Sequence, residues 1–101
     1  MVEHAGVRRY RWEEMEKEEV TEVIFRRVIS GERAMLAQIH LAKGARVPTH
    51  SHDNEQFTIL LAGSLKFWLG EERRELTLRA GEVLHIPSGL PHEAEALEDC
   101  L

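Results

Sequence analysis

The sequence has 101 residues, of which 43% are hydrophobic and 31% charged, and its formal net charge is −5. This length allows a single domain, the hydrophobic content excludes a disordered chain, and the negative charge gives no support for binding nucleic acid. Cys100 is the only cysteine, so an internal disulfide is excluded. No apolar run approaches the ~20 residues of a membrane span. Residues 3–11 are charged and unlike a signal peptide, which predicts a cytoplasmic location.

The first part of the chain predicts a β-hairpin that follows a short irregular segment. Residues 7–12 form a short edge strand at most. Residues 12–19 are rich in helix formers but too few to form a stable helix, so one turn or a loop is expected there. Residues 20–29 are rich in β-branched side chains and predict a strand. A turn at residues 30–32 and an alternating second strand over residues 33–42 complete the hairpin.

The rest of the chain predicts short strands separated by glycine turns. Pro48 stiffens the segment that approaches His50. No linker, repeat or low-complexity segment interrupts the pattern. Short strands at regular spacing predict an all-β fold, an antiparallel sandwich or barrel. The expected strands are residues 56–61, 65–69, 76–79, 83–86 and 93–97.

The candidate chemistry lies in the histidines. His50 and His52 are two residues apart, so their imidazoles lie on one face of an extended segment. Gln56 has the same parity and can reach the same ion through its amide oxygen, whereas His92 has to come from another strand. Imidazole suits zinc, copper, iron, nickel and manganese alike. A His-x-His pair is weak evidence for a site when it stands alone.

The spacing around these residues is more specific. The first pattern, over residues 44–63, has five, one, three and six residues between Gly44, His50, His52, Gln56 and Gly63. The second, over residues 81–92, has five, one and two residues between Gly81, Pro87, Gly89 and His92. These patterns resemble the two cupin motifs, G-x5-H-x-H-x(3,4)-E-x6-G and G-x5-P-x-G-x2-H-x3-N. The glycines suit tight turns at barrel corners.

The resemblance implies a cupin fold, which is an antiparallel double-stranded β-helix or jelly-roll barrel, formed by one domain over residues 1–101. Such a barrel brings the two motifs together although they are far apart in sequence. It also implies one divalent metal ion, and zinc, nickel, manganese, iron and copper stay open as its identity. The ligands implied are His50, His52, Gln56 and His92.

Two positions depart from the motifs. Gln56 stands where the family usually has Glu; a neutral amide predicts a stronger Lewis acid that is bound more weakly. Glu55 or water is the alternative ligand, but parity and spacing favour Gln56. Ala96 replaces an Asn that does not bind metal in the family. His40 is expected to be a hydrogen-bonded structural side chain, with the cavity wall as its alternative place, and His85 is expected to be structural.

Within the superfamily, three histidines and one glutamine on so small a barrel resemble the cupins of pectin degradation, which act on unsaturated uronate sugars. Residues 91–99 are also similar to that group. The resemblance implies a metal-assisted enzyme that isomerises or ketonises a small oxygenated substrate such as a sugar acid. An oxygen-using dioxygenase and a non-catalytic metal-dependent binding module are the alternatives. The relatives carry an acid suited to proton transfer on a strand beyond the position of Leu101, so no catalytic residue is predicted here.

The resemblance and the exposed strand edges of a small barrel predict a homodimer, built partly from the N-terminal strands near residues 7–10 or 20–25. The partners expected are therefore a second copy of the chain and a small molecule, with neither nucleic acid nor a membrane.

Overall fold

The described part of the chain is all-β and antiparallel. The structure, a computed structural model, describes residues 2–4 and 6–101, with side chains from Gly6 onward. None of the described residues lies in a helix that is long and apolar enough to cross a membrane. The elements are β1 (Val2–His4), β2 (Val7–Arg8), a 3-10 turn (Trp12–Glu14), β3 (Glu18–Thr21), β4 (Ile24–Ser30), β5 (Met35–Leu41), β6 (Arg46–His50), β7 (Gln56–Ile59), β8 (Ser64–Leu69), β9 (Arg74–Arg79), β10 (Val83–Ile86) and β11 (His92–Ala96).

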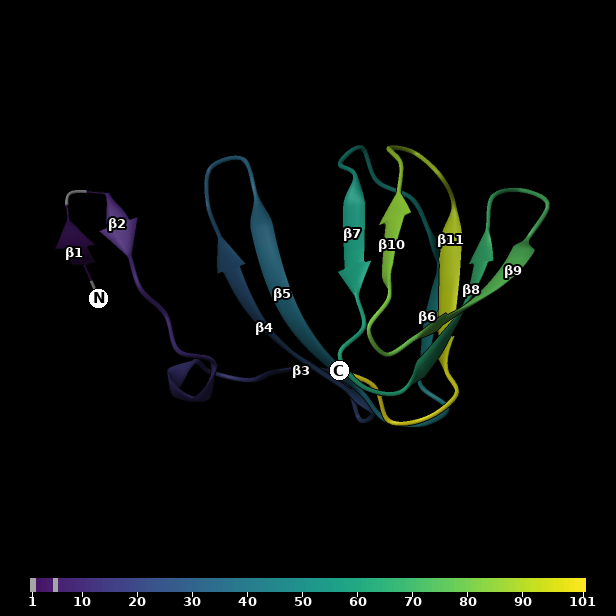
Figure 1. Cartoon of the computed structure of the whole chain (residues 1–101), viewed down its shortest axis with the longest axis horizontal. Helices are drawn as coiled ribbons and strands as arrows, with labels where there is room; N and C mark the ends of the chain where they lie inside the picture. Colours follow the sequence, from purple (N-terminus) through teal and green to yellow (C-terminus); the bar gives the residue numbers. More distant parts are fainter. Residues whose placement is uncertain (1, 5) are drawn as a thin grey trace.

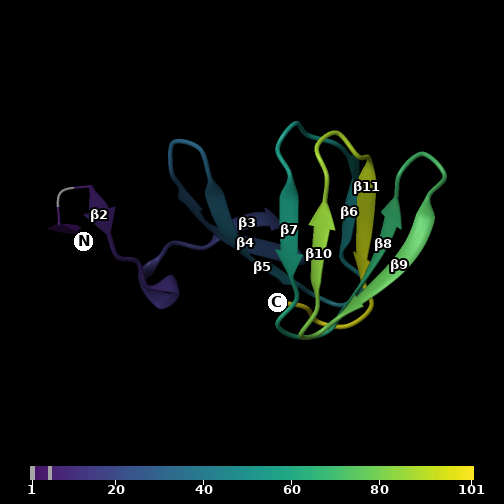
Figure 2. The same cartoon turned by 45° about the horizontal axis from the view of Figure 1, so that its top comes forward.

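The strands form a barrel-like body with an N-terminal extension. The described strands pair in the orders β6-β11-β8-β9, β3-β4-β5, β10-β7 and β1-β2. Figure 1 shows β7 and β10 beside β5 and the four-stranded sheet, and Figure 2 shows the same strands wrapping around one interior. In both views β1 and β2 lie away from this body. The antiparallel jelly-roll-type architecture expected from the sequence is confirmed.

The core is built around β11, whose side chains alternate between the interior and the surface. His92, Ala94 and Ala96 are buried, whereas the glutamates between them are partly exposed. On the neighbouring strand β8, Phe67 lies opposite Ala94 and Leu65 opposite Ala96. Each large side chain therefore lies beside a small one, which lets the interior fill without overlap. The buried apolar residues are Ile24, Leu41, Ala45, Leu60, Leu65, Phe67, Leu78, Ile86, Ala94, Ala96 and Cys100.

The predicted strand over residues 20–29 is wrong as a single element. The chain turns at residues 22–23, which separates β3 from β4. The Val23 amide donates to Oγ1 of Thr21 at 3.1 Å, and such local bonds from threonine favour a turn over a continuous ladder. The expectation of a turn or loop over residues 12–19 is confirmed for residues 12–17, which contain the 3-10 turn at Trp12–Glu14, but β3 begins at Glu18.

Strands β1 and β6 were not predicted, and several others differ from the prediction by one or two residues at their ends. Strand β6 contains Pro48, which lowers strand propensity. It is an edge strand whose one neighbour is β11, so a proline without an amide hydrogen is tolerated there. Strand β9 begins at Arg74 rather than residue 76, and β11 begins at His92 rather than residue 93.

The C-terminal residues bridge two strands that do not pair with each other. The Cys100 amide donates to the Leu41 carbonyl at 2.7 Å, and the Leu61 amide donates to the Leu101 carbonyl at 2.8 Å. Gly63 permits this approach, because a Cβ at that position would lie 2.3 Å from the Asp99 carbonyl oxygen. Among the described strands, β5 and β7 share no ladder above this bridge, so the wall of the barrel is open between them.

Candidate metal centre

The pairing of β6 with β11 brings the two sequence motifs together. His50, at the end of β6, lies opposite His92, at the start of β11. His52 follows two residues after His50 in the loop to β7. The ring centroids are 4.2 Å apart for His50 and His92, 5.0 Å for His52 and His92, and 5.5 Å for His50 and His52. One ligand atom from each ring lies within 4.8 Å of the others, so the three residues can hold a metal ion.

Each of these imidazoles is oriented by its own backbone. A carbonyl oxygen can only accept, so a ring nitrogen that faces one carries the hydrogen, and the neutral ring then has its lone pair on the other nitrogen. The same arrangement orients histidines that bind metals in proteins. In His50, His52 and His92, Nδ1 donates to the carbonyls of Pro48, Asn54 and Leu90 at 2.9, 2.8 and 2.8 Å. The three Nε2 lone pairs are thereby left for a cation.

His92 gives the clearest sign of a missing partner. Its side chain is 3% exposed, and its Nε2 atom is buried without a hydrogen-bond partner among the described residues. Burial lowers the pKa of the His92 ring, the bond to the Leu90 carbonyl opposes this shift, and the charges of His50 and His52 lower the pKa further. The neutral ring, which is the form that binds metal, is therefore favoured.

Gln56 lies beside this cluster at the start of β7. Its Nε2 donates to Oγ1 of Thr58 at 2.9 Å, which turns Oε1 toward His52. Oε1 lies 3.0 Å from Nε2 of His52. In this orientation both atoms are acceptors in the neutral side chains, so a cation shared by both atoms would make the contact favourable. The donor set thus fits a divalent metal, and the amide oxygen is positioned to join the three imidazoles.

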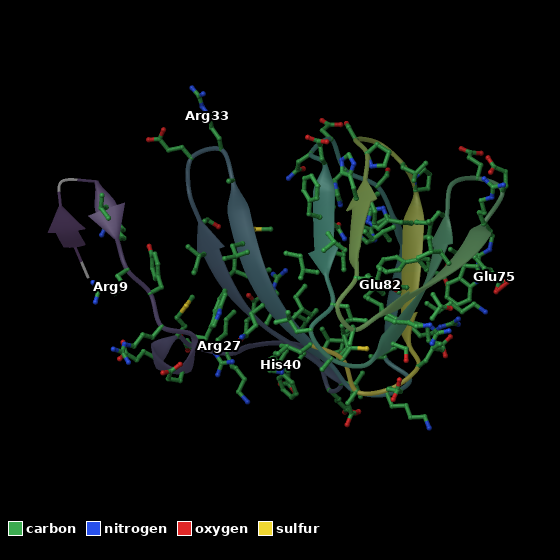
Figure 3. The ribbon with its side chains drawn as sticks, in the orientation of Figure 1. Arg9, Arg27, Arg33, His40, Glu75 and Glu82 are labelled. Atoms are coloured by element: carbon green, nitrogen blue, oxygen red, sulfur yellow. The ribbon has the colours of Figure 1, made fainter. Side chains whose placement is uncertain are left out.

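The structure separates the other candidates from the cluster. Glu55, the alternative to Gln56, pairs with His85 at 2.6 Å, and that ring stacks on the exposed Phe57. His40 does not line the cavity at the cluster, and its Nε2 atom is buried with no partner in the described chain, so it is not the hydrogen-bonded side chain expected. Figure 3 shows His40 at the lower end of β5. The role of Thr58 was missed; its parity with Gln56 on β7 is the signal that points to it.

A cavity of about 210 Å³ lies against the cluster, bounded by His50, His92, Gln56 and Thr58. Most of the rest of its wall is apolar, and no lysine, arginine, aspartate or glutamate of the described chain lines it. A cation at the cluster would therefore be the main charge that a molecule in this cavity meets.

Comparisons with known proteins agree with this fold. A family model for the cupin domain matches residues 37–99, more than half of the chain, so the chain belongs to the cupin family. No curated protein matches the sequence. The motif resemblance found in the sequence is thus confirmed at the level of the family.

Several solved structures share the fold. KdgF from Halomonas sp. is 24% identical, with a TM-score of 0.77 over 90% of this chain and 84% of its own. An RmlC-like cupin from Shewanella frigidimarina is 20% identical, with a TM-score of 0.72 over 90% of this chain and 81% of its own. A variant of oxalate decarboxylase from Bacillus subtilis is 20% identical, with a TM-score of 0.76 over 90% of this chain but 26% of its own. At these identities the likeness establishes the fold.

Proposed function

We propose that this chain is a metal-dependent cupin enzyme, in which His50, His52, Gln56 and His92 hold one divalent cation beside the cavity. Its substrate is a small oxygenated molecule, and the sequence resemblance suggests a sugar acid that is isomerised or ketonised. The observation that carries the proposal is the convergence of three Nε2 lone pairs, one of which, on His92, is buried without a partner.

The residues of the site supply a neutral and rigid ligand set. A divalent cation held by these residues would polarise a carbonyl, carboxylate or hydroxyl and would stabilise developing negative charge. Three neutral imidazoles and one amide add no negative charge of their own, so they do not offset the charge of the cation. The bonds from Nδ1 to the backbone fix the orientation of each ring.

A metal-dependent binding module is the second candidate. The observation that favours it is that no side chain of the described cavity wall has a carboxylate or an amine that could move a proton. Such a module would hold its ligand on the cation and would not turn it over.

A metal-exchange assay tests the proposal. The protein is loaded with zinc, nickel, manganese or iron and assayed on unsaturated uronates and related sugar acids, with and without oxygen. Lewis-acid chemistry should survive with zinc or nickel and need no oxygen. Turnover that depends on oxygen and stops with zinc would overturn the proposal in favour of an oxygenase, and binding without turnover under every condition would favour the binding module.

A charge substitution sharpens this test. Gln56→Glu should keep the metal, and more tightly, because it adds a negative charge beside the imidazoles. It should also lower turnover, because that charge offsets the charge of the cation. The matched control is Gln38→Glu on β5, where the side chain accepts a hydrogen bond from Arg27 and does not line the cavity. Equal turnover of both variants would contradict a role for Gln56 at the metal.

A further inference from the structure

The wall of the cavity beside the cluster is mostly apolar. Thirteen residues line it, of which nine are apolar. They come from β5, β6, β7, β8 and β11, so apolar side chains face the cavity from several directions. Ile39 of β5, Ile59 of β7 and Leu101 are among these apolar residues.

The few polar groups of the wall are already engaged. Nδ1 of His50 and of His92 donates to the backbone, and the amide of Gln56 lies between His52 and Thr58. Thr58 accepts from Gln56, so its hydroxyl keeps one hydrogen that it can donate. The amide of Gln56 also keeps the second of its two hydrogens. Beyond the cation site, the side chains of the wall therefore offer a ligand only two hydrogen-bond donors, on Gln56 and Thr58.

Because the wall has few free hydrogen-bonding groups, we expect the affinity of a ligand to depend on how many hydroxyl groups it carries. A buried hydroxyl that loses its water without gaining a partner costs about tenfold in affinity. A methylene moved from water into an apolar cavity gains about fourfold. Because no lysine or arginine of the described wall can pair with an anion, a ligand's carboxylate has to bind at the cation. The cavity volume, about 210 Å³, lies below the roughly 300–1,000 Å³ of pockets for drug-sized ligands, so the ligand is small.

We propose that the cavity selects a short monocarboxylate with an unsubstituted hydrocarbon body, and that it discriminates against polyhydroxylated acids of the same length. This inference rests on the metal site of the proposed function, but it replaces the sugar acid that the sequence resemblance suggests with an acid that carries fewer hydroxyl groups. The carboxylate binds at the cation on His50, His52, Gln56 and His92, and the hydrocarbon body lies against Phe67, Leu65 and their neighbours.

The test is calorimetric titration of the zinc-loaded chain with hexanoate and with galacturonate. Both are six-carbon monocarboxylates, so they differ mainly in their oxygen substituents. Hexanoate should bind at least about tenfold more tightly, and affinity should rise by about fourfold per methylene from butanoate to hexanoate. Tighter binding of galacturonate by protein that retains zinc would overturn this inference and leave the metal site standing. Failure to retain zinc, measured by elemental analysis beforehand, would overturn the proposed function itself.

A variant of the cavity wall gives an independent readout. Val47→Thr keeps the shape of the side chain and adds a hydroxyl to the wall, so it should weaken hexanoate binding and strengthen galacturonate binding. The matched control, Val83→Thr, lies on an exposed face of β10 away from the cavity and should change neither affinity. Equal effects of the two substitutions, in variants with unaltered melting temperatures, would contradict the proposed selectivity.

Discussion

Replacing His92 by leucine should stabilise the metal-free protein. The His92 ring is buried, and its Nε2 atom lacks a partner among the described residues, which costs about 1–3 kcal/mol. The substitution also removes the bond from Nδ1 to the Leu90 carbonyl, worth about 0.5–1.5 kcal/mol. The net gain is about 1 kcal/mol, which corresponds to roughly 4–8 °C in the melting temperature of a domain of this size.

Bound metal should make the wild type more stable than the His92→Leu variant. A cation at 100 times its Kd stabilises the wild type by about 2.7 kcal/mol, because it binds the folded chain alone. The His92→Leu variant keeps only two of the three imidazoles and should gain little. The variant is more stable by about 1 kcal/mol without metal, and this difference is subtracted from the stabilisation of the wild type by metal. With metal, the wild type should therefore be more stable than the variant by roughly 2 kcal/mol.

Urea unfolding at neutral pH, with a chelator and with saturating zinc, measures both differences. The matched control is His40→Leu, because the Nε2 atom of His40 is also buried without a partner in the described chain but lies outside the cluster. It should raise stability in both conditions and leave the effect of zinc unchanged. A His92→Leu variant that is less stable than the wild type in chelator, or that zinc stabilises as much as the wild type, would refute the reasoning.

Three further predictions concern the ligands, pH and assembly. His50→Ala combined with His52→Ala should abolish metal binding, and undiminished metal by elemental analysis would reject the assignment. Metal affinity should fall in titrations below about pH 6.5, because protons compete for the imidazoles. Since the pKa of His92 is lowered in the folded chain, the metal-free protein should also lose stability as the pH falls below that value, where the unfolded chain binds more protons; a constant melting temperature across this range would contradict this. We also predict a homodimer, because the N-terminal extension exposes Val7 and Tyr10; a monomeric mass from light scattering at micromolar concentration would exclude it.

Local patterns in the sequence predicted most strands well. The predicted strands over residues 65–69 and 83–86 correspond to β8 and β10, because the alternation of the first and the short apolar segment of the second are properties of one strand alone. The errors lie where strand pairing or a local hydrogen bond, rather than the hydrophobic pattern, determines the secondary structure. Pro48 is part of β6 because β11 pairs with this strand from one side, and Thr21 ends β3 by accepting a hydrogen bond from the Val23 amide. Neither effect is visible in a hydrophobic pattern.

The sequence by itself determined which residue types are available to hold a cation, because the spacing of His50, His52, Gln56 and His92 within two glycine-framed motifs is a property of the chain alone. Only the tertiary structure decided that they meet. His92 reaches His50 through the ladder between β6 and β11, which joins residues far apart in sequence. The same structure showed that the backbone carbonyls orient the rings and that the cavity beside them is apolar. Strand pairing is non-local, so its register, and every contact across it, depends on the packing of the whole barrel.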